Sequence, residues 1–146
     1  MSGVTLTEFL LARIAEDEEA ARACALTYPT PWEVVDRGHM AKVQADAPFF
    51  LSVVELDQDA EPNAEWLSDR IAHVSRWDPA RVLAECEAKL LIVREHPRHG
   101  WLPEGRDECA QCGCADDNAV DWPCLTLKAL TLPYADHPDY REEWRP

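Results

Sequence analysis

The stretch HPRHGWLPEGRDECAQCGCADDNAVDWPC, residues 96–124, decides how the C-terminal part of this chain folds. It holds four of the six cysteines and lacks the hydrophobic periodicity of a helix or a strand, so its own side chains build no core. Cys109 and Cys112 form a Cys-x2-Cys pair followed by Gly113, the pattern of a zinc knuckle. We expect the glycine to supply a left-handed backbone conformation in the knuckle turn. A metal ion bound by these cysteines would then order the stretch.

A third sulfur belongs to Cys124, in the first turn of the helix predicted next. Unpaired N–H groups at a helix N-terminus favour the thiolate, the form that binds metal. Three sulfurs leave a tetrahedral site one ligand short, and two completions compete. His96 ends the preceding helix, with His99 as its close substitute, whereas Cys114 would give an all-cysteine site. We favour the histidine, because Cys112 and Cys114 are only two residues apart.

A structural zinc is the interpretation that this spacing favours, since closed thiolate-rich sites usually serve structure and not catalysis. The alternatives are a redox pair and a loop of free thiols. A redox Cys-x2-Cys normally opens a helix after a strand, whereas this pair follows a helix within a polar loop. Cys24 and Cys86 lie on apolar helix faces, where we expect small buried side chains.

The composition limits the partners that the chain can bind. Its 146 residues include 28 Asp and Glu against 14 Lys and Arg, a formal charge of −14. Nucleic acids and anionic membranes would repel such a chain, so we expect neither as a direct partner. Met1–Glu19 shows no signal-peptide pattern, and no apolar run reaches transmembrane length. We therefore expect a cytoplasmic protein with reduced cysteines.

Hydrophobic patterning predicts an α+β fold in a single domain, residues 1–146. Thr5 or Thr7 should cap the first helix, and Asp78-Pro79 should start the longest later one. Phe49–Val54 is the expected third strand. The predicted segments are an N-terminal helix (1–28), a small antiparallel β-meander (32–56), a helical hairpin (64–96), a zinc-knuckle loop with a short C-terminal helix (97–132) and a tail (133–146).

Evidence for enzymatic activity is weak. No phosphate-binding loop, dinucleotide fingerprint or nucleophile elbow is present in the sequence. His73 is the one candidate for acid–base chemistry, and that hypothesis requires an enclosed pocket around it. The Tyr and Trp residues of the tail are expected to fold back over the domain edge.

Several stretches together resemble one family, domain of unknown function 6221, found in actinobacteria and their phages. Pro31-Trp32 belongs to the likeness, and the closing WPCLTL run is its most specific part. The longer stretches are FLLARIAEDEEAARA (9–23), HVSRWDPARVLAECEAK (73–89), CAQCG (109–113) and WPCLTLKALTLPYADHPDYREEW (122–144).

The resemblance implies a ligand set. Members of that family show a histidine at the end of the long helix, a Cys-x2-Cys and a Trp-Pro-Cys, which correspond here to His96, Cys109, Cys112 and Cys124. Two departures stand out: Trp77 occupies a position where histidine is common, and the additional Cys114 keeps the all-cysteine site as an alternative. The family implies an actinobacterial or phage origin but carries no assigned activity.

From these observations we expect a small acidic zinc-binding protein, a non-enzymatic interaction or regulatory module whose partner is another protein. The alternative of a different class is an acidic mimic of nucleic acid that blocks a basic partner. An enzyme working through His73 is the third hypothesis.

Overall fold

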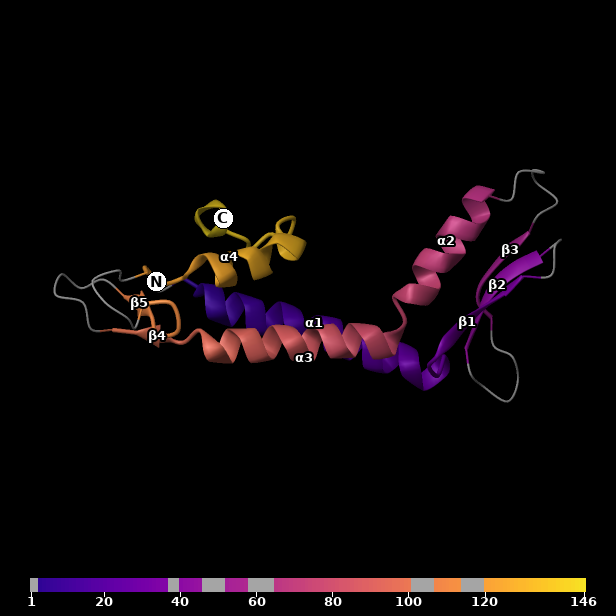
Figure 1. The fold of residues 1–146 in the computed structure, drawn as a ribbon, viewed down its shortest axis with the longest axis horizontal. Coiled ribbons are helices and arrows are strands. Elements are labelled where there is room, and N and C mark those ends of the chain that lie inside the picture. Colours follow the sequence, from indigo (N-terminus) through magenta and orange to yellow (C-terminus); the bar gives the residue numbers. More distant parts are fainter. Residues whose placement is uncertain (1–2, 37–39, 46–51, 58–64, 101–106, 114–119) are drawn as a thin grey trace. The chain divides into compact units, whose positions relative to one another are not determined.

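The structure is a computed structural model that describes residues 3–36, 40–45, 52–57, 65–100, 107–113 and 120–146. It confirms the α+β class (Figure 1). The elements in the described residues are α1 (Leu6–Thr27), β1 (Trp32–Asp36), β2 (Met40–Ala45), β3 (Ser52–Asp57), α2 (Glu65–Arg76), α3 (Pro79–Glu95), β4 (Arg98–His99), β5 (Glu108–Cys109), α4 (Leu125–Thr131) and the 3-10 turns η2 (Leu132–Tyr134) and η3 (Glu142–Trp144).

The chain is divided into two compact units. The sheet unit comprises residues 17–85, and the cluster unit comprises residues 1–16 and 86–146. Among the described residues, no helix has the length and apolar character needed to cross a bilayer.

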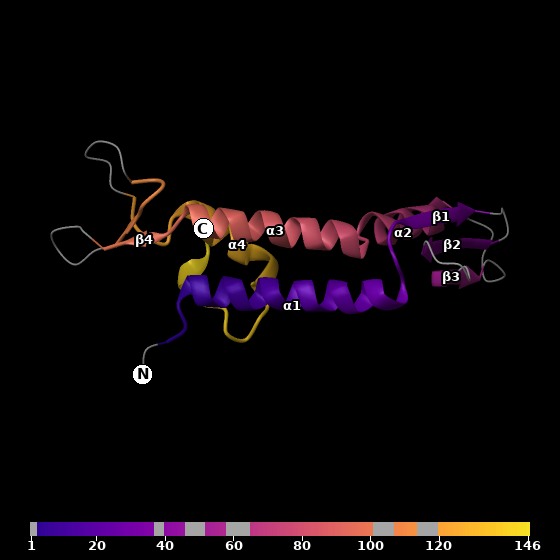
Figure 2. The same cartoon turned by 90° about the horizontal axis from the view of Figure 1, so that it is seen from below.

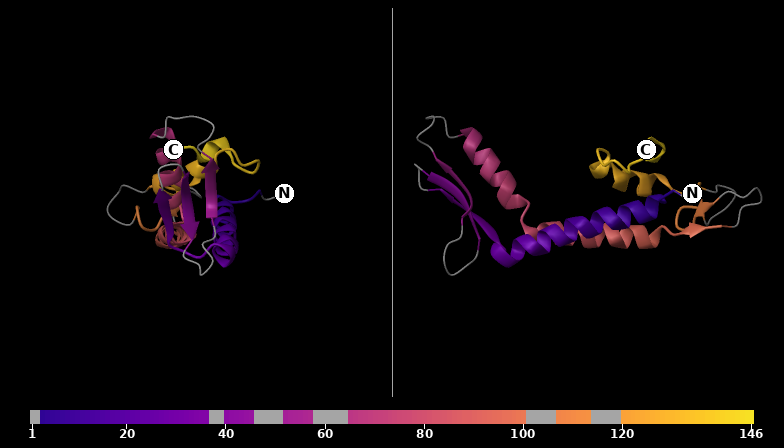
Figure 3. Two further views of the ribbon diagram at one scale, coloured as in Figure 1. Left: turned by 90° about the vertical axis from the view of Figure 1, so that its right-hand side faces the viewer. Right: turned by 180° about the vertical axis from the view of Figure 1, so that it is seen from behind.

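The sheet unit contains the predicted meander, with strand order β1-β2-β3 and antiparallel pairing throughout. In the described residues its third strand runs from Ser52 to Asp57; the earlier part of the expected strand, residues 49–51, lies outside the described residues. Helix α2 covers one face of this sheet (Figure 3). Ile71 of α2 and Val43 of β2 are 1% and 0% exposed, with Trp32 packed against them.

Helix α1 begins with a capping box at Thr5, one of the two predicted caps. The amide of Glu8 donates to Thr5 Oγ1 at 3.2 Å, and the amide of Thr5 donates to Glu8 Oε2 at 2.8 Å. These reciprocal bonds satisfy two N–H groups that a helix start otherwise leaves unpaired.

Two consecutive helices follow the sheet where the helical hairpin was predicted. The second begins as expected: the amide of Arg81 donates to Asp78 Oδ1 at 2.9 Å, and Pro79 is the first helical residue. Helix α2 is also held on the sheet. Its Ser75 Oγ donates to the carbonyl oxygen of Trp32 at 2.8 Å.

In the cluster unit, α4 and the tail lie beside residues 6–16 of α1 (Figure 2). The ring of Phe9 is 5.0 Å from that of Trp144 and 6.2 Å from that of Tyr140, measured between centroids. Leu127 of α4 is fully buried and Trp144 is 4% exposed. The prediction that tail aromatics fold back over the domain is confirmed.

Candidate metal centre

His96 is the first residue after α3, and the chain then enters the small β4–β5 sheet. The two strands pair antiparallel, with Arg98 opposite Cys109. The amide of Ala110 donates to the carbonyl oxygen of Pro97 at 3.0 Å. These hydrogen bonds hold Cys109, which is 0% exposed, next to the end of α3.

The Cys-x2-Cys turn closes with a hydrogen bond from the amide of Gly113 to the carbonyl oxygen of Cys109, 2.8 Å long. The backbone of Gly113 is not in the left-handed region, so the reason predicted for this glycine is wrong. Space is the reason. A Cβ at this position would lie 3.1 Å from the Cys109 carbonyl oxygen, and 3.2 Å from both Glu108 Oε2 and the amide nitrogen of Val120.

Cys124 is the N-cap of α4, in an extended conformation with φ −70° and ψ 167°. It is 2% exposed. The preceding residues hold it beside β5, because the amide of Trp122 donates to the carbonyl oxygen of Asp107 at 2.9 Å and Asp121 forms a β-bridge with Glu108. The third sulfur thus reaches the other two from a separate element.

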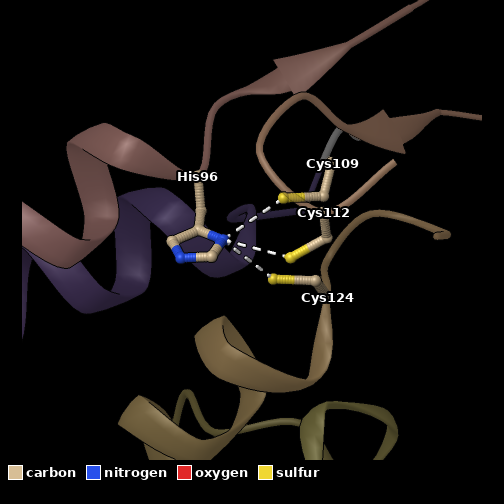
Figure 4. Close-up of side chains that lie close together, drawn as sticks. All are labelled: His96, Cys109, Cys112 and Cys124. Atoms are coloured by element: carbon tan, nitrogen blue, oxygen red, sulfur yellow. Dashed lines mark hydrogen bonds between the residues drawn. The ribbon is translucent and has the colours of Figure 1, made fainter. Parts of the chain in front are cut away.

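One imidazole nitrogen faces all three sulfurs (Figure 4). His96 Nδ1 lies 3.3 Å from the Sγ atom of Cys109, 3.5 Å from that of Cys112 and 3.4 Å from that of Cys124. All four ligand atoms lie within 4.8 Å of one another. The four residues that sequence reasoning combined therefore form one compact cluster.

Hydrogen bonding does not account for three equal contacts. An imidazole nitrogen has either one lone pair or one hydrogen, so it satisfies one sulfur well and not three at once. In a tetrahedral site with Zn–N of about 2.0 Å and Zn–S of about 2.3 Å, nitrogen and sulfur ligands lie about 3.5 Å apart. The Nδ1–Sγ distances of 3.3–3.5 Å are close to this separation. The cluster thus fits a metal site and is compatible with zinc.

The thiols differ in acidity. Burial raises the pKa of the Cys124 thiol, but hydrogen bonds from the backbone amide of Leu127 and from the neighbouring thiols leave that pKa below its ordinary value. At Cys112, desolvation of the thiol and the hydrogen bonds and charge of the other cysteines raise the pKa to about 12. The expected thiolate at the start of α4 is supported, whereas three adjacent thiolates require a cation between them.

Comparison with protein families gives one match, which spans residues 3–146 and is described as a family of unknown function, DUF6221. The chain belongs to DUF6221. This confirms the resemblance found in the sequence. Comparisons with curated proteins and with solved structures gave no match.

In this DUF6221 member, the structure describes one of the two alternative ligands, His99, but not the other, Cys114. His99 lies outside the cluster: its Nδ1 is 3.2 Å from Glu108 Oε1, and its side chain is 54% exposed. His96 is therefore the histidine beside the sulfurs. Cys114 lies outside the described residues, so its role stays a prediction.

The remaining candidate residues take no part in the cluster. Cys86 is 1% exposed, as predicted for a small core side chain, whereas Cys24 is half-buried. His73 is exposed on α2, with its ring 6.2 Å from that of Trp77. The enzyme hypothesis needed His73 in an enclosed pocket, and this position does not provide one.

Sequence reasoning missed the residues that support the centre. Arg98 pairs with Asp107 at 2.5 Å, which raises the pKa of the guanidinium, and its guanidinium carbon lies 5.8 Å from the Trp122 ring centroid. This contact joins β4 to the segment before Cys124. Strands of two residues leave no periodicity, so no sequence signal indicated their pairing.

Proposed function

We propose that this chain binds one structural zinc ion through His96 Nδ1 and the Sγ atoms of Cys109, Cys112 and Cys124. The observation that carries the proposal is the single imidazole nitrogen placed 3.3–3.5 Å from three sulfurs. Sulfur-rich sets with one imidazole suit zinc, whereas magnesium and calcium prefer oxygen ligands.

A structural role follows from the closed ligand set. A catalytic zinc keeps a position for water or substrate, whereas four protein ligands fill a tetrahedral shell. Cys109 and Cys124 are almost fully buried, so solvent reaches the site chiefly beside Cys112. The ion would connect the end of α3, the turn after β5 and the start of α4. Its binding energy would then contribute directly to folding of the cluster unit.

At the level of the whole protein, the proposed function is a non-enzymatic interaction or regulatory module in the cytoplasm of an actinobacterium or its phage. The proposed origin rests on the resemblance described above to DUF6221, the family to which the chain belongs. A metal that stabilises a loop without offering a reactive position supports a binding role. The partner that we propose is another protein.

Metal content of the purified chain tests the zinc proposal, with two histidine variants as a matched pair. We expect one zinc per chain by elemental analysis. His96→Ala should lose it, whereas His99→Ala should retain it, because the two histidines are three residues apart and only His96 faces the sulfurs. A folded wild-type chain without metal, or equal loss in both variants, would overturn the proposal.

A second candidate function rests on the formal charge of −14. An acidic mimic of nucleic acid would bind a basic protein by long-range attraction that salt screens. Partners captured from a host lysate should then dissociate between low and moderate salt. Capture that salt does not weaken would exclude the mimic and favour the module proposed above.

A further inference from the structure

A cavity of about 240 Å³ opens within the sheet unit. Its walls come from the second half of α1, from β1, from the turn between α2 and α3, and from the start of α3. The side chains that give it chemical character are Asp17, Cys24, Trp32 and Trp77. All of these positions belong to described residues, and no metal ligand is among them.

The cavity offers aromatic surface and one carboxylate. Two indole rings line it, and Asp17 is the only charged side chain among the described residues that form its walls. The indole N–H of Trp32 donates to the carbonyl oxygen of Tyr28 at 3.0 Å, so the polar atom of that ring is already used. Trp32 therefore contributes its π-system, whose faces carry negative potential, and the Trp77 ring adds a second π-system.

An intramolecular contact shows that one of these rings accepts a cation. The guanidinium carbon of Arg81 lies 4.3 Å from the centroid of the Trp77 ring. Arg81 Nε is also held by Glu85 Oε1 at 2.9 Å, and Arg81 does not line the cavity. Arg81 thus already makes with the Trp77 ring the kind of cation–π contact that a cationic ligand would use.

We propose that this cavity binds a small organic cation of the alkylated-ammonium class. Methyl groups on nitrogen spread the positive charge over an apolar surface, which suits contact with indole rings better than with water. Trp32, Trp77 and Val82 supply that contact, and the carboxylate of Asp17 supplies the opposite charge. A metal ion is a poor occupant, since the described residues of the walls offer only one carboxylate and one thiol.

Choline and 3,3-dimethyl-1-butanol separate charge from shape, because they differ only in nitrogen against carbon at the branched centre. Each is titrated into the full chain at constant ionic strength, and the indole N–H signals of Trp32 and Trp77 are followed by NMR. We expect saturable shifts with choline and none with the alcohol. Equal shifts with both, or no shift with choline, would overturn the proposal.

Two carboxylates on α1 provide a matched pair of variants. Asp17→Asn should weaken choline binding about fivefold or more, as expected for loss of one nearby charge. Glu19→Gln removes an exposed acid of the same helix outside the cavity and should leave binding unchanged. Equal weakening by both variants would show that only the overall charge of the protein matters, and it would contradict binding of choline in the cavity.

Alkylation of Cys24 gives a second measurement on the unmodified chain. Its thiol lines the cavity and is half-buried, so an occupant should shield it. Choline should slow its reaction with iodoacetamide, followed by peptide mass spectrometry, while the alcohol should not. An unchanged rate at concentrations that saturate the NMR shifts would place the cation elsewhere.

Discussion

At the scale of single residues, the decisive feature is which nitrogen of His96 faces the sulfurs. Nδ1 is close to the backbone, so its use as a ligand draws the end of α3 towards the cysteines. The site is therefore tight around the backbone of the Cys-x2-Cys turn. Small changes in that turn should therefore weaken metal binding.

Gly113→Ala is the smallest such change. The added Cβ would press on the Cys109 carbonyl oxygen at 3.1 Å and on two further atoms at 3.2 Å. We expect a loss of about 1–3 kcal/mol in the free energy of unfolding, together with weaker metal retention. Gly100→Ala is the control, because among the described residues its Cβ meets only Asp107 Oδ1, at an ordinary 3.5 Å. Similar thermal unfolding of the two variants would contradict the crowding argument.

The acidities of the cysteines predict the proton balance of metal binding. Without metal, the pKa of Cys112 is raised to about 12, so this thiol is protonated at neutral pH. Zinc binds the thiolate, and uptake must therefore release that proton. Affinity should fall as pH falls, and calorimetry in buffers of different ionisation enthalpy should count at least one proton released. Uptake at neutral pH without proton release would contradict this assignment.

At the scale of elements, the start of α1 depends on one short motif. Thr5→Ala removes both side-chain bonds of the Thr5 hydroxyl and should cost about 1 kcal/mol of stability. Thr7→Ala is the matched control, since the cap bonds belong to Thr5. Chemical denaturation compares the two, and an equal loss from Thr7→Ala would show that the capping box contributes little.

The same motif should make the stability of the protein depend on pH, in a direction that follows from the pKa of Glu8. Hydrogen bonds from Thr5 hold the pKa of Glu8 below its ordinary value of 4.5. The stability that Glu8 contributes is complete above that ordinary pKa and is lost as pH falls through the lower folded-state value. Thr5→Ala removes the bond from the Thr5 hydroxyl to Glu8 but keeps the bond from the Thr5 amide, so it should flatten the acid limb of the stability profile only in part.

Elements with strong local signals could be predicted from the sequence, and their packing could not. The Asp78-Pro79 start and the cap at Thr5 depend on residues next to one another. The predicted strand Phe49–Val54 overlaps β3 from Ser52 onward, and its first three residues lie outside the described part. A hydrophobic stripe shows which face of α2 is buried but not that the sheet buries it.

The ligand set could also be predicted only in part from the sequence. Spacing indicated three sulfurs, but it left His96, His99 and Cys114 open, because the fourth ligand depends on where α3 ends relative to α4. Family resemblance favoured His96, and the structure places His96 beside the sulfurs. The crowding at Gly113 depends on Val120, seven residues further along, and sequence spacing does not reveal such a contact.

At the scale of the whole molecule, metal binding should matter unequally in the two units. The expected single domain stays a prediction, and metal removal tests it. Chelation should raise amide hydrogen exchange at Ala110 and Gly113, whose hydrogen bonds support the cysteine turn. Val43 at the centre of the sheet should keep its protection. Loss of protection at both places together would indicate one cooperative domain.

X-ray absorption at the zinc edge would show whether one histidine and three cysteines hold the proposed structural zinc ion. The full chain, loaded with one equivalent of zinc, should show three sulfur neighbours at about 2.3 Å and one nitrogen neighbour at about 2.0 Å. The histidine contribution should disappear in His96→Ala and persist in His99→Ala. A shell of four sulfurs, or one of nitrogen and oxygen alone, would contradict the claim.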